Sequence, residues 1–187
     1  MGMVLVAGWA PVREARAGTV ATGSVAAAQP DSSLEQEVLL RINRIRADHG
    51  LQPVEIDPRL QQAARLHSSD MAVSRCFQHD DCNGGGAWSE RIYASYPRPA
   101  RIAENITAGH AEAAAAVEAW MRSEAHRANI LRPEWRGTGI AHVSLPGSPY
   151  GHYWTQTFGV VAPPSAADAV PAPALSLRVQ PAESSSR

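Results

Sequence analysis

The sequence contains no lysine, so all 17 of its basic residues are arginine. They are balanced by 18 acidic residues, which gives a formal net charge of −1 at pH 7. Nucleic acids and anionic membranes bind to a concentrated basic face, so we expect neither to be the main partner. No apolar run approaches the roughly 18–20 residues that a membrane-spanning helix needs, and we expect no transmembrane segment.

Cysteine is also scarce, with only Cys76 and Cys82 present. Six positions apart, they can close a small disulfide loop, and such bonds persist in oxidising compartments. A zinc site is the alternative, but Cys-x5-Cys is not a usual zinc spacing and the chain has no second cysteine pair. We therefore expect a disulfide that fixes the shape of a loop with His79 at its centre.

The N-terminal segment lacks the basic stretch that usually opens a secretion signal. An apolar run over Met3–Ala10 is nevertheless followed by Ala15-Arg16-Ala17, which fits a signal-peptide cleavage site, and Ala26–Ala28 offers a second option. A start codon placed too far downstream would account for the missing stretch. A disordered cytosolic tail is the alternative. We expect export to an extracellular or periplasmic location.

Length and composition predict one domain rather than two. The chain has 187 residues, of which 44% are hydrophobic, and this is enough for one core. Residues 1–30 are signal-like and then small and polar. Residues 163–187 are dominated by proline, alanine and serine, a composition that cannot build a core. We expect one globular domain over residues 31–162 between disordered ends.

Within this domain the apolar pattern changes from a helical period to a period of two. A first helix is predicted to start at Ser32-Ser33, where Glu35 completes a capping-box pattern, and to end at Gly50. Asp57 is the predicted N-cap of a second helix. The further predicted elements are a short helix over 88–93, a strand over 102–108, a helix over 111–122 that continues or restarts through 126–131, and a hairpin of strands 138–145 and 152–159. The fold class that these elements predict is α+β.

Three side chains stand in contexts that favour chemistry. His79 lies in the polar, acidic loop between the cysteines, and His126 lies where one helical segment gives way to another. Glu104 interrupts an apolar segment, and because an isolated buried carboxylate is costly, it must be paired or functional. His67 falls on the apolar face of the second helix and is interpreted as a core residue. His142 could face either side of its strand.

Five short motifs occur in order along the predicted domain. They are Phe77-x-His79; Ala103-Glu104-Asn105-Ile106; Trp120 followed by His126-Arg127-Ala128-Asn129-Ile130-Leu131; Gly137-x-Gly139; and Tyr153-Trp154-Thr155-Gln156-x-Phe158-Gly159. Together they resemble the bacterial branch of the CAP superfamily, which includes cysteine-rich secretory, antigen 5 and pathogenesis-related 1 proteins. The resemblance covers about Leu34–Val160. Each motif alone is weak, but five with this order and spacing are specific.

The resemblance implies an α-β-α sandwich, with a small antiparallel sheet between helical layers and a cleft that presents two histidines and two acidic residues. Several family members bind a divalent cation such as zinc there. By motif, His79 and His126 match the two histidines, the implied metal ligands, and Glu104 matches the first carboxylate. The second carboxylate falls at Ser123. The adjacent Glu124 is the candidate substitute, although a shift of one residue turns a helical side chain by about 100°.

One further segment, Gly151-His152-Tyr153, resembles a motif around the second histidine of plant and animal members. It falls in the last predicted strand, after Gly137-x-Gly139, where bacterial members have only the Tyr-Trp-Thr-Gln segment. We therefore prefer His126 over His152 as the second histidine of the cleft.

Three functions are compatible with these residues. The favoured one is a secreted, monomeric binding module whose cleft holds zinc or another divalent cation and a small-molecule, apolar or lipid ligand. The second is a metal-dependent hydrolase of protease or esterase type with Glu104 as general base, but the sequence contains neither Gly-x-Ser-x-Gly nor His-Glu-x-x-His. The third is an extracellular scaffold whose loops bind a protein or cell-envelope partner and whose cleft is vestigial. We lean against an enzyme.

Overall fold

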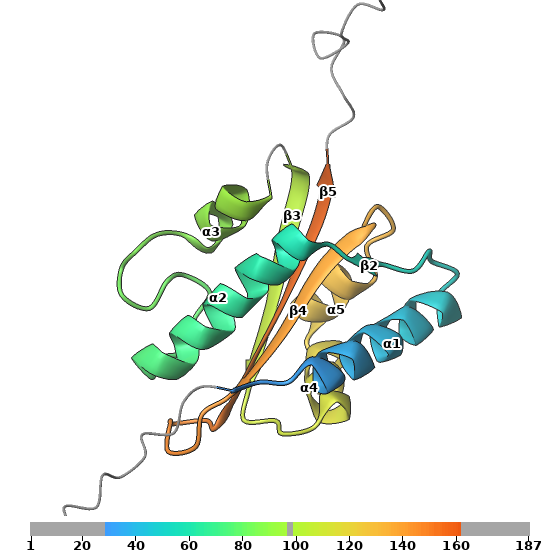
Figure 1. Cartoon of the computed structure of the whole chain (residues 1–187). Coiled ribbons are helices and arrows are strands. Elements are labelled where there is room, and N and C mark those ends of the chain that lie inside the picture. Colours follow the sequence, from blue (N-terminus) through green and yellow to red (C-terminus); the bar gives the residue numbers. More distant parts are fainter. Residues whose placement is uncertain (1–28, 97–98, 162–187) are drawn as a thin grey trace, which may run out of the picture.

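A central sheet with helices on both faces forms the body of the protein (Figure 1). The computed structural model describes residues 29–96 and 99–161, so the predicted signal segment and the Pro/Ala-rich tail lie outside the described residues. In chain order the elements are β1 (Gln29–Pro30), α1 (Ser32–Asp48), β2 (Glu55–Ile56), α2 (Pro58–Ser74), α3 (Trp88–Ser95), β3 (Pro99–Ala108), α4 (Ala113–Arg122), α5 (Glu124–Ile130), β4 (Gly137–Ser144) and β5 (His152–Val161). The predicted α+β class and α-β-α layering are confirmed.

The strands follow the order β1-β4-β5-β3, with β2 beside β4. The long neighbours, β4 with β5 and β3 with β5, pair antiparallel. The short β2 pairs with β4 in parallel, so the sheet is mixed rather than purely antiparallel as expected. This is possible because the two strands are far apart in sequence and no hairpin joins them. Among the described strands β3 pairs with β5 alone, which makes β3 an edge of the sheet.

Strand β5 alternates between the two helical layers, as its period of two predicts. Trp154 and Phe158 pack in the core that α1, α4 and α5 cover. Tyr153 belongs to the apolar cluster beneath α2, and the hydroxyl of Thr157 donates to the carbonyl of Leu60 in α2 at 3.0 Å. Both faces of the strand are buried, and threonine is satisfied there by a helix rather than by water.

The first helix begins differently from its prediction. Asp31 is the N-cap of α1, and its carboxylate accepts hydrogen bonds from the backbone N–H groups of Ser33 at 3.0 Å and Leu34 at 3.3 Å. Glu35 does not reach back to the cap as a capping box requires. Its carboxylate instead accepts a bond from Gln61 in α2. The capping-box prediction was wrong because this contact between α1 and α2 uses the glutamate.

The end of α1 lies where the sequence predicts it. Gly50 has a φ of +69°, which favours glycine. Its N–H donates to the carbonyl of Ala47 at 2.9 Å, and the N–H of Leu51 donates to the carbonyl of Arg46 at 2.9 Å. These two bonds form a Schellman motif, so the predicted stop of the helix at Gly50 is confirmed.

Helix α2 lies very close to β4. Its predicted N-cap, Asp57, is confirmed. The predicted apolar face is buried, and its members are Leu60, Ala63, Ala64, His67 and Met71. Gly139 in β4 lies directly beneath the helix, and a β-carbon there would collide with the backbone of Leu60 and Gln61. This close approach holds α2, and the side chains on its buried face, against the sheet.

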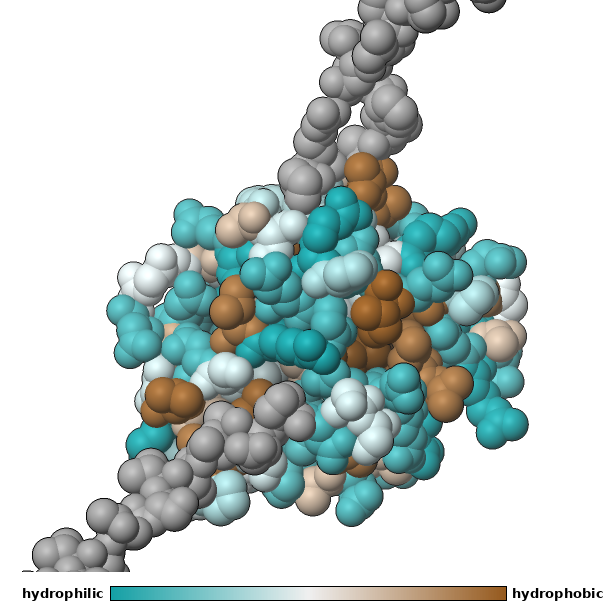
Figure 2. All heavy atoms as spheres, in the orientation of Figure 1, coloured by the Kyte–Doolittle hydropathy of each residue, from teal (hydrophilic) through white to brown (hydrophobic). Residues whose placement is uncertain are grey.

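Figure 2 shows a mostly hydrophilic face on which the hydrophobic side chains gather in small, separate groups. Scattered apolar side chains are normal on protein surfaces. Within residues 29–96 and 99–161, no helix combines the length and apolar composition that crossing a bilayer demands.

Candidate functional site

The candidate site forms at the edge of the sheet, where β3 runs between the two helical layers. Successive residues of a strand point to opposite faces, so Glu104 faces α2 and α3 whereas Asn105 faces α5. The side-chain amide of Asn105 donates to the carbonyl of His126 in α5 at 3.1 Å. Side chains from both helical layers therefore meet at this edge.

Glu104 is the buried centre of the site, with 5% of the residue exposed. Its Oε1 accepts a hydrogen bond from Nδ1 of His79 at 3.0 Å and lies 3.8 Å from Nε2 of His67. Its Oε2 accepts from Nη2 of Arg91 at 2.8 Å. Arg91 is buried too, and it also bonds Asp81. The guanidinium offsets the cost of burying the carboxylate, because the pair is charged and hydrogen-bonded.

A disulfide-closed loop carries His79 to Glu104. Cys76 and Cys82 are bonded as predicted, with Cα atoms 6.1 Å apart. The carboxylate of Asp70 in α2 accepts a bond from the N–H of Cys82 at 2.8 Å, which holds the end of the loop against the helix. A carboxylate only accepts, so the proton of the neutral His79 ring is on Nδ1 and the lone pair is on Nε2. The His79 side chain is 44% exposed, so solvent can reach the ring.

His126 comes from the first turn of α5, in the opposite layer. Ser123 caps this helix, and its hydroxyl accepts the N–H of His126 at 3.5 Å. The rings of His79 and His126 have centroids 6.5 Å apart and planes inclined by 55°. Burial lowers the pKa of His126 below its ordinary value, and the charge of His79 acts in the same direction. Both effects favour a neutral His126 ring.

A pocket of about 290 Å³ adjoins these side chains. It is lined by His79, Trp88, Ile102, Ala103, Glu104 and Asn129. Binding pockets usually combine apolar walls with a few placed polar groups. This pocket has that composition, and its volume suits a small ligand.

Glu124 lies away from this group of side chains. It is exposed in the first turn of α5, and among residues 29–96 and 99–161 no hydrogen bond or ion pair joins it to His79, Glu104 or His126. Ser123, at the position of the family's second carboxylate, is the N-cap of α5. The structure thus brings together three of the four predicted cleft residues.

A second pair of histidines lies elsewhere, on β4 and β5. Nε2 of His142 and Nδ1 of His152 are 3.1 Å apart, and the two rings stack with planes inclined by 8°. The ring of His142 also packs on Trp154, with centroids 4.3 Å apart. Burial, followed by the charge of His152, lowers the pKa of His142 to about 4. This pair shares the face of Trp154, whereas Glu104 faces α2.

Two residues near Glu104 were not predicted from the sequence as part of the site: Arg91 was not singled out, and His67 was interpreted as a core residue only. No spacing pattern singles out an arginine on a short helix after a glycine-rich loop. The one signal in the sequence was Glu104 itself, because a buried carboxylate predicts a cationic side chain beside it. The interpretation of His67 as a core residue is correct for burial, but its Nε2 also lies near Glu104. Burial lowers the pKa of His67, so the ring is kept neutral.

His79 and His126 are better placed than Glu104 to be the ligands of a divalent cation. Nε2 of His79 keeps its lone pair, and Nδ1 is held by Glu104, an arrangement in which a carboxylate orients a metal-ligating histidine. Two imidazoles on one zinc ion have centroids roughly 5–6 Å apart, given Zn–N distances near 2.1 Å. The observed separation of 6.5 Å is close to this. Both Glu104 oxygens already accept bonds, which suits an orienting role.

An α-β-α sandwich with a histidine–carboxylate cleft at the sheet edge defines the class to which the CAP resemblance pointed. The chain belongs to the CAP family, described as the cysteine-rich secretory protein family, whose model matches residues 39–158. It is 34% identical over 128 residues to YkwD of Bacillus subtilis, covering 68% of this chain and 47% of YkwD. It is 31% identical over 106 residues to the membrane protein YlbC of the same organism, covering 57% of this chain and 30% of YlbC. The chain thus spans half or less of these relatives.

Solved structures share the fold. An extracellular protein containing an SCP domain from Bacillus anthracis has a TM-score of 0.60 and 29% identity, covering 69% of this chain and 41% of that one. An outer surface protein from Borrelia burgdorferi has a TM-score of 0.67 and 18% identity, covering 73% of this chain and 99% of that one. At 18% identity the Borrelia protein supports the fold alone.

Proposed function

We propose that this CAP-domain protein is an exported binding module whose cleft holds a divalent cation through His79 and His126. The observation that carries the proposal is the 3.0 Å hydrogen bond from Nδ1 of His79 to Glu104. A zinc-ligating histidine commonly donates its other N–H to such a carboxylate, which fixes the tautomer and makes the ligating nitrogen more basic. Glu104 is accordingly the residue that orients His79.

A cation held by two protein nitrogens keeps positions for further ligands. Structural zinc sites are closed by four protein ligands, whereas open sites leave room for water or a bound molecule. The pocket of about 290 Å³ beside His79 has apolar walls at Trp88 and Ile102. We infer that it takes a small ligand with one polar group for the cation and an apolar part for these walls.

Binding is better supported than hydrolysis. A general base needs a carboxylate free to take a proton from a bound water. Glu104 already accepts bonds from His79 and from Arg91, and Glu124 lies exposed on α5. The bonded, buried carboxylate supports a positioning role.

Export is supported by two observations. The disulfide between Cys76 and Cys82 suits an oxidising compartment. The similar Bacillus anthracis structure is described as an extracellular protein. Mass spectrometry of the protein in culture supernatant and periplasmic fractions tests this part, and its recovery only from the cytoplasm would refute it.

Calorimetric titration of zinc into the full, oxidised chain tests the cation site. We expect His79→Ala and His126→Ala each to weaken zinc binding in the cleft by at least a hundredfold, because each removes a ligand. His49→Ala is the matched control, since His49 is exposed at the end of α1, and it should bind zinc as the wild type does. Absence of zinc binding by the wild type, or unchanged binding in both cleft variants, would refute the proposal.

A further inference from the structure

A histidine and two aspartates gather beside the cleft, on the side of α2. His67 and Asp70 lie three residues apart on α2, and Asp81 comes from the disulfide loop. One potential ligand atom of each residue lies within 4.8 Å of those of the other two. Residues three apart are neighbours on a helix surface, so α2 presents the first two together and the loop brings the third to them.

One ring nitrogen of His67 has no hydrogen-bond partner among the described residues. The residue is fully buried, and its Nε2 lies 2.9 Å from the carbonyl of Gln78. A carbonyl only accepts, so Nε2 carries the proton and Nδ1 carries the lone pair. Within the described residues Nδ1 is buried without a hydrogen-bond partner. Buried polar atoms are nearly always paired, and the lone pair of this nitrogen can bind a cation.

The charges around this histidine favour a cation. Asp70, Asp81 and Glu104 are three carboxylates, and among residues 29–96 and 99–161 Arg91 is the one guanidinium bonded to them. The group therefore holds two negative charges in excess. Each aspartate also keeps lone pairs beyond its present bonds, because a carboxylate has about four acceptor sites. A divalent cation would balance the excess.

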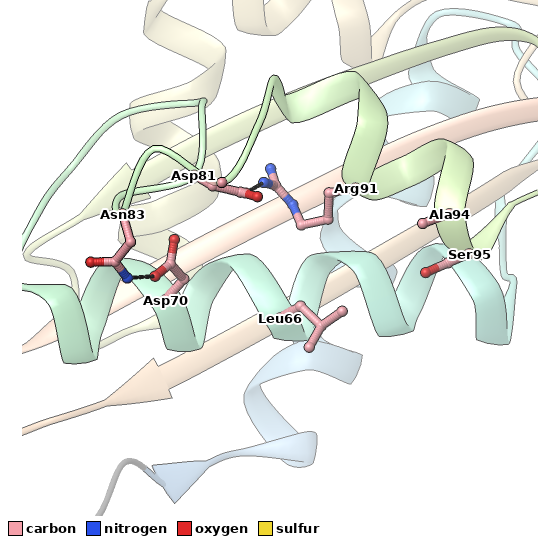
Figure 3. Close-up of a pocket in the computed structure, with 8 residues that line it drawn as sticks. Leu66, Asp70, Asp81, Asn83, Arg91, Ala94 and Ser95 are labelled. Atoms are coloured by element: carbon pink, nitrogen blue, oxygen red, sulfur yellow. Dashed lines mark hydrogen bonds and ion pairs between the residues drawn. The ribbon is translucent and has the colours of Figure 1, made fainter.

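The cluster is open to solvent through a second pocket, of about 390 Å³. Figure 3 shows Asp70 on α2 and Asp81 on the loop above it, with the side chain of Arg91 extending across from α3 to Asp81. Asp70, Asp81 and Arg91 all line this pocket. A hydrated ion can therefore reach the two carboxylates from outside, and a ring nitrogen of the buried His67 lies within 4.8 Å of both.

We propose that His67, Asp70 and Asp81 form a second divalent-cation site, separate from the pair His79 and His126. One imidazole nitrogen with two carboxylates is a mixed nitrogen and oxygen set, which suits Mn²⁺ or Zn²⁺ better than Ca²⁺ or Mg²⁺. Ligands of one such ion lie roughly 3 Å apart, so binding draws the Asp81 segment toward α2. The ion would clamp the loop that carries His79 and stiffen the cleft.

Titration of Mn²⁺ into the chelator-treated full chain, followed by electron paramagnetic resonance, tests this site. Asp70→Asn removes the charge and keeps an oxygen that can accept the N–H of Cys82, while it gives up the bond that Oδ1 accepts from Asn83. Asp81→Asn is the second ligand variant. Each should weaken Mn²⁺ binding tenfold or more. Asp48→Asn, at an exposed position of α1, should leave it unchanged.

The outcomes separate this site from the cleft. Paramagnetic broadening of the backbone amides around Asp70 and Cys82, retained in His126→Ala, supports the second site even where one aspartate variant fails to fold. Three results would overturn it: no Mn²⁺ binding by the wild type, unchanged binding in both aspartate variants, or loss of binding in His126→Ala. The last would place the ion in the cleft and leave the proposed function standing.

Discussion

Two histidine pairs in this fold differ in ways that separate a binding site from a packed core. His79 and His126 come from a loop and a helix in different layers, and their ring centroids lie 6.5 Å apart. His79 lines a pocket together with Glu104. His142 and His152 come from neighbouring strands, with ring nitrogens 3.1 Å apart. The second pair is closer, yet its rings stack and bond each other.

The difference shows that proximity of histidines does not define a cation site. His142 has no carboxylate bonded to its ring among the described residues, and it is 2% exposed beneath the stack with Trp154. His79 has both an orienting carboxylate and access to solvent. An orienting acceptor leaves the other nitrogen ready for a ligand. In the stacked pair Nε2 of His142 instead faces Nδ1 of His152, and Nδ1 of His142 is buried.

Replacing the orienting carboxylate should have the largest effect. Glu104→Gln removes the charge that holds both His79 and Arg91, which leaves the buried guanidinium bonded to the carboxylate of Asp81 and the carbonyl of His79. We expect the free energy of unfolding to fall by about 3 kcal/mol and zinc affinity in the cleft to fall about tenfold to a hundredfold. Urea unfolding and calorimetry measure the two effects.

The matched control is Glu118→Gln. Glu118 pairs with Arg122 at 3.5 Å on the exposed surface of α4, where both side chains are 69% exposed. Exposed ion pairs contribute little, so we expect a change below about 0.5 kcal/mol. Equal losses of stability in the two variants would show that the buried contacts of Glu104 have no special role.

The histidine pair on the sheet should instead appear as a pH dependence of stability. His142 has a folded pKa of about 4 against about 6.5 in the unfolded chain. The unfolded state therefore takes up the proton first as the pH falls, and stability is lost from pH 6.5 down to pH 4, by up to about 3 kcal/mol. His152 and Asp31 are the charged groups that act on His142. The lowered pKa values of His67 and His126 act in the same direction.

Urea unfolding at a series of pH values measures this loss. His142→Gln should make the dependence between pH 6.5 and 4 less steep, because the contribution of His142 is gone and those of His67 and His126 remain. His49→Gln should keep the slope of the wild type, since His49 is exposed. An unchanged slope in His142→Gln would contradict the assignment.

The smallest effect is expected at Glu124. Its exposed position on α5 predicts that Glu124→Gln changes the free energy of unfolding by less than about 0.5 kcal/mol and zinc affinity by less than about twofold. A tenfold loss of zinc affinity in calorimetry would contradict this and show that Glu124 contributes to cation binding in the cleft.

Local patterns were enough to predict most of the fold. Helix ends marked by Gly50 and Asp57 follow from backbone geometry and hydrogen bonding at a single position, and the period of two over 152–159 gives the two faces of β5. The α-β-α layering was predicted from the family resemblance that the five motifs carry. The predicted capping box of α1 was wrong because the partner of Glu35 lies on another helix, and a local sequence pattern does not contain that contact.

The site was only partly predictable for the same reason. His79, Glu104 and His126 stand in recognisable motifs, and the structure brings them to one edge of the sheet. Arg91 joins Glu104 only after the chain has folded α3 over β3, and His67 comes near it only because α2 lies so close to β4. These contacts depend on packing between layers, and sequence spacing does not record it.

The central claim is that Glu104 fixes the tautomer of His79 and leaves Nε2 for a cation. Long-range proton–nitrogen NMR spectra of the histidine rings, recorded with and without zinc, test it most directly. The account predicts that His79 carries its proton on Nδ1 in the free protein and that zinc shifts Nε2 of His79 and a nitrogen of His126, with His142 and His152 unaffected. A proton on Nε2 of free His79, or a zinc shift confined to the pair on the sheet, would contradict it.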